Sequence, residues 1–177
     1  MLNNILISGY PGCGKTTLIN KIIKRLNCKI GGFYTHEKRE FGKRTGFYIT
    51  DFSGNQMIMA EVNLKSKYHV GKYGVNVNAF EKIGIPALKN ADENTDLIVI
   101  DEIGKMEMFS PKFCNMLEKI FDSHKPILAT IKEKDCKLTA KLKARDDVKI
   151  FHITTQNRDE SVKIIFDKLS EIMDFSL

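Results

Sequence analysis

The sequence predicts an α/β fold in which helices cover both faces of a mostly parallel sheet. Short apolar runs without polar alternation are separated by segments of helical periodicity, which is typical of parallel strands buried on both faces. Between residues 29 and 62 the pattern changes to β-rich segments separated by the turn signals EFG and FSGN, which predicts an inserted antiparallel meander. The length of 177 residues suits one domain, residues 1–177.

The first half of the chain opens with an apolar run at Asn3–Ser8, which predicts a buried strand. A glycine-rich turn follows, and apolar periodicity then predicts a helix at about Lys15–Asn27. After the meander, we expect the segment KYHVGKYGVNV to be a loop and Ala79–Ala91 to be a helix. Pro86 predicts an irregularity within this helix, because proline lacks the backbone N–H that a helix interior uses.

The second half of the chain alternates strands and helices. The expected strands are Leu97–Ile100, Pro126–Thr130 and Val148–Ile153. The expected helices are Pro111–Ser123, Asp135–Lys143 and Arg158–Ser170. Pro111 suits a first helical turn, where the missing N–H costs nothing. This alternation predicts that the parallel sheet continues to the end of the chain.

The composition is that of a globular protein, with 42% hydrophobic and 28% charged residues. No apolar run approaches the ~20 residues of a membrane-spanning helix, and the first residues lack the features of a signal peptide. We therefore expect no membrane partner and a cytoplasmic location. The four cysteines form no CxxC pair, so we expect free thiols rather than a zinc site or disulfides.

The net charge of +6 is compatible with binding an anion. The densest lysine stretch, Lys132–Asp147, has helical spacing and lacks an aromatic platform. We interpret it as a solvated helix face, and we expect no nucleic-acid partner.

The octet GYPGCGKT, Gly9–Thr16, fits the phosphate-binding pattern G-x-x-x-x-G-K-[ST]. It follows an apolar strand and opens a helix, which is the context that this motif requires. Its glycines allow the backbone N–H groups to turn toward phosphate oxygens at the positive end of the helix. We expect Lys15 to reach the β- and γ-phosphates and Thr16 to bind Mg²⁺. Cys13 inside the loop predicts sensitivity to thiol reagents.

The stretch LIVIDEIGKMEMF, from Leu97 to Phe109, drives an apolar strand into adjacent acids. It is either a strand end with a solvated loop or a site that holds a metal and activates water. Beside a P-loop, Asp101 is placed to hold Mg²⁺ and Glu102 to orient the attacking water. Glu107 competes with Glu102 for the second role. Lys105 either faces the γ-phosphate or pairs with Glu107.

Five segments together resemble the small P-loop nucleoside-triphosphatases of the THEP type, which include the cancer-related nucleoside triphosphatase. These segments are GYPGCGKTTLI, GGFYTHEKREFGKRTGF, VGKYGVNVNAFEKIGIPAL, DLIVIDEIGKMEMF and DVKIFHITTQNRD. The resemblance implies a three-layer P-loop NTPase sandwich with a RecA-like sheet, in which Pro126–Thr130 separates the P-loop strand from the Asp-Glu strand. Thr130 then either senses the γ-phosphate or caps a turn.

The resemblance also implies Mg²⁺-dependent hydrolysis of nucleoside triphosphates to diphosphate and phosphate. It implies broad base tolerance, with ATP, GTP, CTP and UTP or TTP as substrates. Two alternatives stay open, namely a nucleotide or small-metabolite kinase with the same P-loop, and a nucleotide-dependent factor associated with RNA. We expect a monomer.

Two further segments carry candidate residues. After the last strand, Arg158 is placed to stack on a base and Asn157 to add a hydrogen bond, although Asn157 also suits a helix N-cap. In the hairpin, Arg44 or Arg39 either stabilises transition-state charge or keeps an edge hairpin soluble. His36 and His69 are interpreted as loop or strand-end residues.

These motifs define three predicted sets of residues. The nucleotide-binding set is Gly9, Tyr10, Pro11, Gly12, Cys13, Gly14, Lys15, Thr16, Thr17, Ile98, Val99, Ile100, Asp101, Glu102, Ile103, Gly104, Lys105, Thr130, Asn157 and Arg158. The metal ligands are Thr16 and Asp101. The catalytic set is Lys15, Glu102, Lys105, Glu107 and Arg44.

Overall fold

The computed structural model describes residues 2–174 and contains one nine-stranded sheet. Its parallel part runs, in spatial order, through β2 (Ile30–Glu40), β7 (Leu97–Ile103), β8 (Ile127–Ile131), β1 (Asn4–Ser8) and β9 (Val148–His152). Strand β8 lies between the P-loop strand β1 and the Asp-Glu strand β7. This order confirms the RecA-like arrangement that the sequence predicted.

The antiparallel part extends the same sheet from β2. Its strands are β3 (Lys43–Asp51), β4 (Gln56–Val62), β6 (Tyr73–Val75) and β5 (His69–Val70). Strand β2 belongs to both parts, because Ile30–Tyr34 pairs with β7 in parallel whereas Phe33–Glu40 pairs with β3 in antiparallel fashion. The insertion therefore begins partway along β2 and not near residue 29.

The segment KYHVGKYGVNV was wrongly predicted to be a loop. It contains the hairpin of β5 and β6, and β6 pairs with β4. The insertion thus reaches Val75 and not only residue 62. Strands of two and three residues are too short to show the alternation by which a strand is recognised in a sequence.

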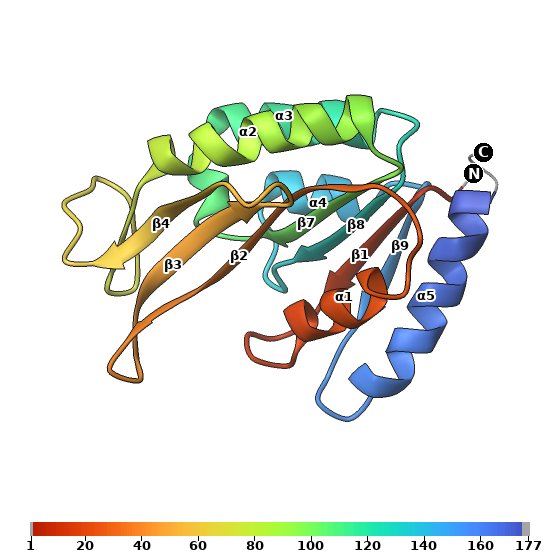
Figure 1. Ribbon diagram of the computed structural model, residues 1–177, viewed down its shortest axis with the longest axis horizontal. Helices are drawn as coiled ribbons and strands as arrows, with labels where there is room; N and C mark the ends of the chain where they lie inside the picture. The colour runs from red at the N-terminus through yellow and green to blue at the C-terminus, as the bar shows by residue number, and fades with distance from the viewer. Residues whose placement is uncertain (1, 175–177) are drawn as a thin grey trace.

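Helices cover the sheet on both faces, which gives the predicted three layers (Figure 1). One face carries α2 (Val77–Asn94) and α3 (Pro111–Phe121), and the other carries α1 (Lys15–Ile23) and α5 (Arg158–Asp174). Helix α4 (Lys137–Lys143) packs beside α3, with Leu142 in the same hydrophobic cluster. In that cluster the rings of Phe33, Phe80 and Phe113 meet edge to face, with centroids 5.0 to 5.8 Å apart.

Several elements end at other residues than the sequence predicted. Helix α1 ends at Ile23 and not at Asn27, because tighter turns follow in which the N–H groups of Arg25 and Leu26 bond three residues back. Helix α2 continues through Pro86 without a break. Strand β7 runs three residues beyond Ile100, so the adjacent acids lie within the strand and not after it.

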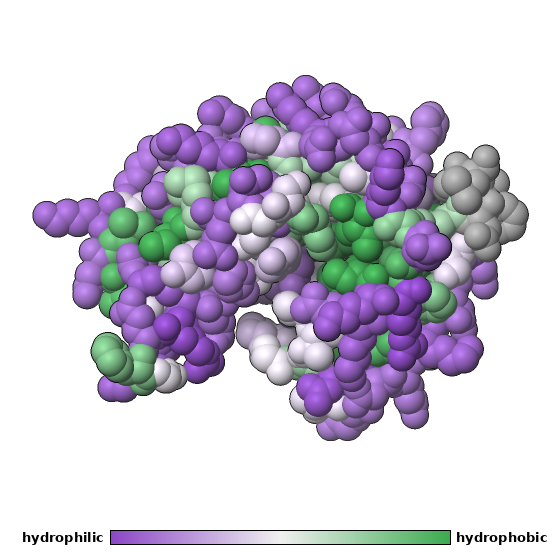
Figure 2. All heavy atoms as spheres, viewed as in Figure 1, coloured by the Kyte–Doolittle hydropathy of each residue, from purple (hydrophilic) through white to green (hydrophobic). Residues whose placement is uncertain are grey.

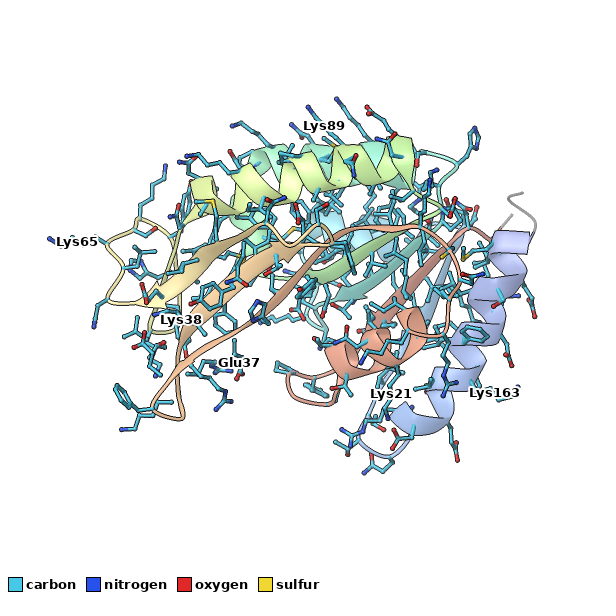
Figure 3. The ribbon with its side chains drawn as sticks, viewed as in Figure 1. Lys21, Glu37, Lys38, Lys65, Lys89 and Lys163 are labelled. Atoms are coloured by element: carbon cyan, nitrogen blue, oxygen red, sulfur yellow. The ribbon has the colours of Figure 1, made fainter. Side chains whose placement is uncertain are left out.

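The carboxyl ends of β1, β7 and β8 lie at one edge of the sheet, together with the turn that precedes α1. The hairpin of β2 and β3 extends past this edge, and its residues Glu37 and Lys38 lie on the protruding part (Figure 3). In the space-filling view a notch separates the protruding hairpin from the part of the molecule that carries α1 (Figure 2).

Candidate functional site

The turn between β1 and α1 has the backbone geometry of a phosphate cradle. Gly12 and Gly14 adopt φ angles of 82° and 103°, which side chains disfavour. Gly14 is the N-cap of α1, and its cap makes no side-chain hydrogen bond. The N–H groups of the first helical turn therefore point to the open side of the loop, where an anion is stabilised by the helix N-terminus.

Lys15 joins this turn to the acidic strand. Its side chain is 8% exposed, and its ammonium donates to the carbonyl oxygens of Gly9 at 2.7 Å and Tyr10 at 3.4 Å. The same nitrogen lies 3.9 Å from Oε2 of Glu102. The lysine of the first motif and an acid of the second thus meet in one place.

Asp101 is almost fully buried within β7. Its Oδ1 accepts a hydrogen bond of 2.5 Å from the hydroxyl of Thr130, and no atom of the described residues pairs with its Oδ2. Burial raises the pKa of the Asp101 carboxyl, while the hydrogen bond from Thr130, the nearby hydroxyl of Thr16 and the charge of Lys15 oppose this rise. The side chains of Thr16 and Asp101, the two predicted metal ligands, therefore lie near each other.

Glu102 and Glu107 crowd around Gly104. A Cβ atom at Gly104 would lie 2.7 Å from Oε2 of Glu107 and 2.8 Å from Oε1 of Glu102, so a larger residue there would displace these carboxylate oxygens. Glu107 is 3% exposed and opens the short 3₁₀-helix η1 (Glu107–Phe109). Burial, followed by the negative charge of Glu102, raises the pKa of Glu107 to about 8.

Glu102 differs from Glu107 in exposure and in its partner. Its side chain is 36% exposed, and it lies beside Lys15. Burial also raises the pKa of Glu102, with the charge of Lys15 acting in the opposite direction and that of Asp101 adding to the rise. Glu102 is therefore the acid of this pair that a bound molecule can reach.

Lys105 does not pair with Glu107, so that alternative is wrong. Glu107 is buried, whereas Lys105 is exposed and forms no ion pair with any described residue. Residues two apart point in different directions in helical or turn geometry, which explains the separation. That Lys105 faces a bound phosphate stays a prediction.

Thr130 lies inside the sheet and does not cap a turn. It is fully buried, and the hydrogen bond to Asp101 is its role in the described structure. The apolar members of the predicted nucleotide-binding set are also part of the core. They are Ile98, Val99, Ile100 and Ile103, all of them 0% exposed. The prediction that they belong to the nucleotide-binding set stays a prediction, and their side chains are packed in the core on the two faces of β7.

Asn157 uses its side chain to close the turn before α5. Its Oδ1 accepts from the backbone N–H of Thr154 at 2.8 Å, and its Nδ2 donates to the carbonyl of His152 at 2.9 Å. Both partners precede Asn157 in the chain, so its side chain does not cap helix α5. The amide that was predicted to contact the base is engaged in these two bonds. Arg158 lies against the P-loop, since a Cβ at Gly14 would be 3.0 Å from its Nη1.

Arg44 is held by its neighbours in the sheet. Its Nε donates to the hydroxyl of Tyr73 at 3.0 Å and its Nη1 to Glu37 at 2.8 Å. The guanidinium also lies 5.3 Å from the ring centroid of Phe47. Arg39 pairs with the other oxygen of Glu37 at 2.5 Å. These contacts give both arginines a structural role.

The remaining residues of the predicted sets divide by exposure. Tyr10, Pro11, Thr16 and Thr17 are exposed along the P-loop and the start of α1, whereas Cys13 is buried. His36 lies within β2 and not in a loop, where its Nε2 contacts the hydroxyl of Thr50.

The structure adds a contact that the sequence did not indicate. Ser8, directly before the P-loop, donates a hydrogen bond to the carboxylate of Glu133, which follows β8. The other oxygen of Glu133 lies 4.0 Å from Nδ1 of His152. These residues are far apart in the sequence and match no motif, so no local signal predicts that they anchor the P-loop.

One cavity, of about 700 Å³, lies far from these residues, at the opposite edge of the sheet. Among the residues that line it are Leu26, Cys28, Pro126 and Phe166. The predicted phosphate-binding residues are at the other edge, so we do not assign the cavity to them.

Comparison with known proteins agrees with this geometry. Residues 4–166 match a protein family described as NTPase. The chain belongs to this NTPase family. A nucleoside-triphosphatase THEP1 from Thermotoga sp. (strain RQ2) is 50% identical over 165 residues, which cover 93% of this chain and 94% of the relative. The resemblance predicted from the sequence is thereby confirmed.

Two solved structures of the family share the fold. THEP1 from Aquifex aeolicus superimposes with a TM-score of 0.87 at 39% identity, covering 94% of this chain and 98% of that one. A human cancer-related nucleoside triphosphatase gives a TM-score of 0.83 at 34% identity, covering 96% of this chain and 98% of that one. The predicted P-loop NTPase architecture is confirmed by both.

Proposed function

We propose that this protein binds nucleoside triphosphates at Gly9–Thr16 and hydrolyses the terminal phosphoanhydride with the help of Mg²⁺. The observation that carries the proposal is the meeting of Lys15 with Glu102 beside the buried carboxylate of Asp101. Positioning of phosphate, metal and water is most of what hydrolysis of this bond requires from a protein.

The residues present fit a Mg²⁺ ion. Oδ2 of Asp101 is a buried carboxylate oxygen without a partner among the described residues, and Thr16 lies near the same carboxylate. No group of three or more His, Cys, Asp or Glu residues in the described chain is arranged to hold a metal. This donor set suits Mg²⁺, which commonly binds through one or two carboxylates plus substrate phosphates and water. Bound there, the ion would neutralise phosphate charge.

We assign the attacking water to Glu102. It is the more exposed of the two glutamates and lies beside Lys15, whose ammonium we direct to the β- and γ-phosphates. Glu107 is buried, and a pKa of about 8 leaves it mostly protonated at neutral pH. A protonated acid cannot accept the proton that a general base takes from water.

We assign transition-state charge stabilisation to Lys15 and Lys105. Lys105 is exposed next to the acidic cluster and has no partner in the described structure. The contacts of Arg44 with Tyr73 and Glu37 do not favour its assignment to this role. The contribution of Lys105 depends on the presence of phosphate at the P-loop.

We further propose broad base tolerance, with ATP, GTP, CTP and UTP or TTP as substrates. Arg158 lies next to Gly14 and offers a planar guanidinium, which stacks on any base. The side chain of Asn157 is engaged within its own turn, so it supplies no base-specific hydrogen bond. A monomeric state and a cytoplasmic location stay predictions from the sequence. No helix of the described chain has the length and apolarity to cross a membrane.

The test is phosphate release from the five triphosphates, with Mg²⁺ or with EDTA, and with or without nucleoside monophosphates. We expect Mg²⁺-dependent release without an acceptor, whereas a kinase would require the acceptor. Lys15→Ala should fold and lose most activity. Lys21→Ala removes an exposed lysine of the same helix, which pairs with Asp159, and should retain activity. Turnover at the wild-type level in folded Lys15→Ala would reject the proposal.

A further inference from the structure

The two oxygens of the Asp101 carboxylate have different surroundings. Oδ1 accepts the hydroxyl hydrogen of Thr130 at 2.5 Å, which is the length of a strong bond from a hydroxyl to a carboxylate. Oδ2 is buried and meets no hydrogen-bonding partner in residues 2–174. The carboxylate thus presents one free oxygen and one that is already engaged.

Thr130 is held firmly in the position from which it donates. It is fully buried in β8, between the strand that carries Asp101 and the P-loop strand, and its Cα pairs with that of Ile7. A branched side chain at such a site has few rotamers available. Its hydroxyl can therefore fix the rotation of the Asp101 carboxylate.

Mg²⁺ and Ca²⁺ use carboxylates differently. Mg²⁺ demands near-octahedral geometry and takes single oxygens, whereas Ca²⁺ accepts about 6–8 ligands and readily binds both oxygens of one carboxylate. A carboxylate whose second oxygen is engaged by a buried hydroxyl suits the first ion better than the second.

We propose that Thr130 keeps Asp101 a one-oxygen ligand and thereby makes the site prefer Mg²⁺ over Ca²⁺. Thr130 is a positioning residue in this proposal, since it acts through Asp101 and does not touch the ion. The inference rests on the proposed nucleotide and metal site, but it does not depend on hydrolysis.

The test measures binding and not turnover. The affinity of a non-hydrolysable triphosphate analogue is determined calorimetrically with Mg²⁺ and with Ca²⁺, for the wild type, Thr130→Val and Thr130→Ser. Valine keeps the shape of threonine without the hydroxyl, and serine keeps the hydroxyl. Thr95→Val is the matched control, because it removes another buried threonine hydroxyl, which bonds to Ala91 at the opposite sheet edge.

For each variant, the dissociation constant of the analogue with Ca²⁺ is divided by the one with Mg²⁺. We expect Thr130→Val to reduce this ratio by about tenfold or more, the usual effect of residues that orient a metal ligand. Thr130→Ser and Thr95→Val should keep the wild-type ratio. If Thr130→Val does not fold, Thr130→Ala replaces it in the same comparison.

Three results would overturn the inference. They are an unchanged ratio in the folded Val or Ala variant, a wild type without preference for Mg²⁺, and a wild type that binds the analogue with neither ion. A wild type that binds with a preference for Mg²⁺ but releases no phosphate would instead refute the proposed hydrolysis and leave this inference standing.

Discussion

The buried acid Glu107 should make the folded protein less stable as the pH rises. Its pKa is about 8 in the folded protein, compared with 4.5 for an ordinary glutamate. Between these two values the folded state holds a proton that the unfolded state has lost. The free energy of unfolding therefore falls as pH increases, and this contribution is fully present only below the unfolded pKa.

The magnitude follows from the two pKa values. One proton of difference gives a slope that approaches ~1.4 kcal/mol per pH unit within the window. From pH 4.5 to pH 7 this amounts to about 3 kcal/mol, a large share of the ~5–15 kcal/mol that stabilises most domains. Glu107→Gln removes the titration and keeps the shape of the side chain, so its stability should lack this decline.

The assay is urea denaturation from pH 4.5 to pH 8, in EDTA and without nucleotide. The stability of Glu107→Gln minus that of the wild type should increase by about 3 kcal/mol between pH 4.5 and pH 7. Other titrating groups cancel in this difference. Glu93→Gln, an exposed change on α2, should follow the wild type. A constant difference between Glu107→Gln and the wild type across the range would show that Glu107 is charged in the folded protein and would refute the reasoning.

Three other substitutions test the roles of single residues. Gly104→Ala places a Cβ between Glu102 and Glu107, so turnover should drop while the circular dichroism spectrum stays that of the wild type. A variant with full activity would show that the two acids need no fixed spacing. Glu102→Gln should bind Mg²⁺-nucleotide and lose turnover by roughly 10²–10⁴-fold in single-turnover assays; if Glu107→Gln alone shows this loss, the two glutamates exchange roles. Arg44→Ala should reduce stability by about 1 kcal/mol and leave turnover near the wild-type rate; a loss in the ~10³–10⁵-fold range of an arginine finger would make it catalytic after all.

The sequence predicted the parts of the structure whose signals are local. An apolar strand, glycines and a lysine stand next to one another in Asn3–Thr16, so the P-loop was visible as one pattern. The order of strands β7, β8 and β1 followed from the family resemblance, and the structure agrees with it.

What the sequence could not predict depends on contacts across the sheet. Thr130 and Asp101 are 29 residues apart, and only the parallel pairing of their strands brings the hydroxyl to the carboxylate. The length of β7 was underestimated because two acids normally end a buried strand. Here the strand continues past them to Ile103, which is fully buried. For Lys105 and Glu107 the sequence misled in another way. Their closeness in sequence suggested an ion pair, but the turn between them points the two side chains apart.

The acidic cluster is itself an argument for function. Asp101, Glu102 and Glu107 gather at one edge of the sheet, and burial raises the pKa of each. The fold therefore opposes their ionisation, and apolar residues of similar size in such positions often give equal or greater stability. Lys15 offsets part of this cost for Asp101 and Glu102, but its charge is not among the causes that act on Glu107. Acids with perturbed pKa values gather at functional sites, so the cost is best explained by the role we propose for them, which is to bind a cation or to accept a proton.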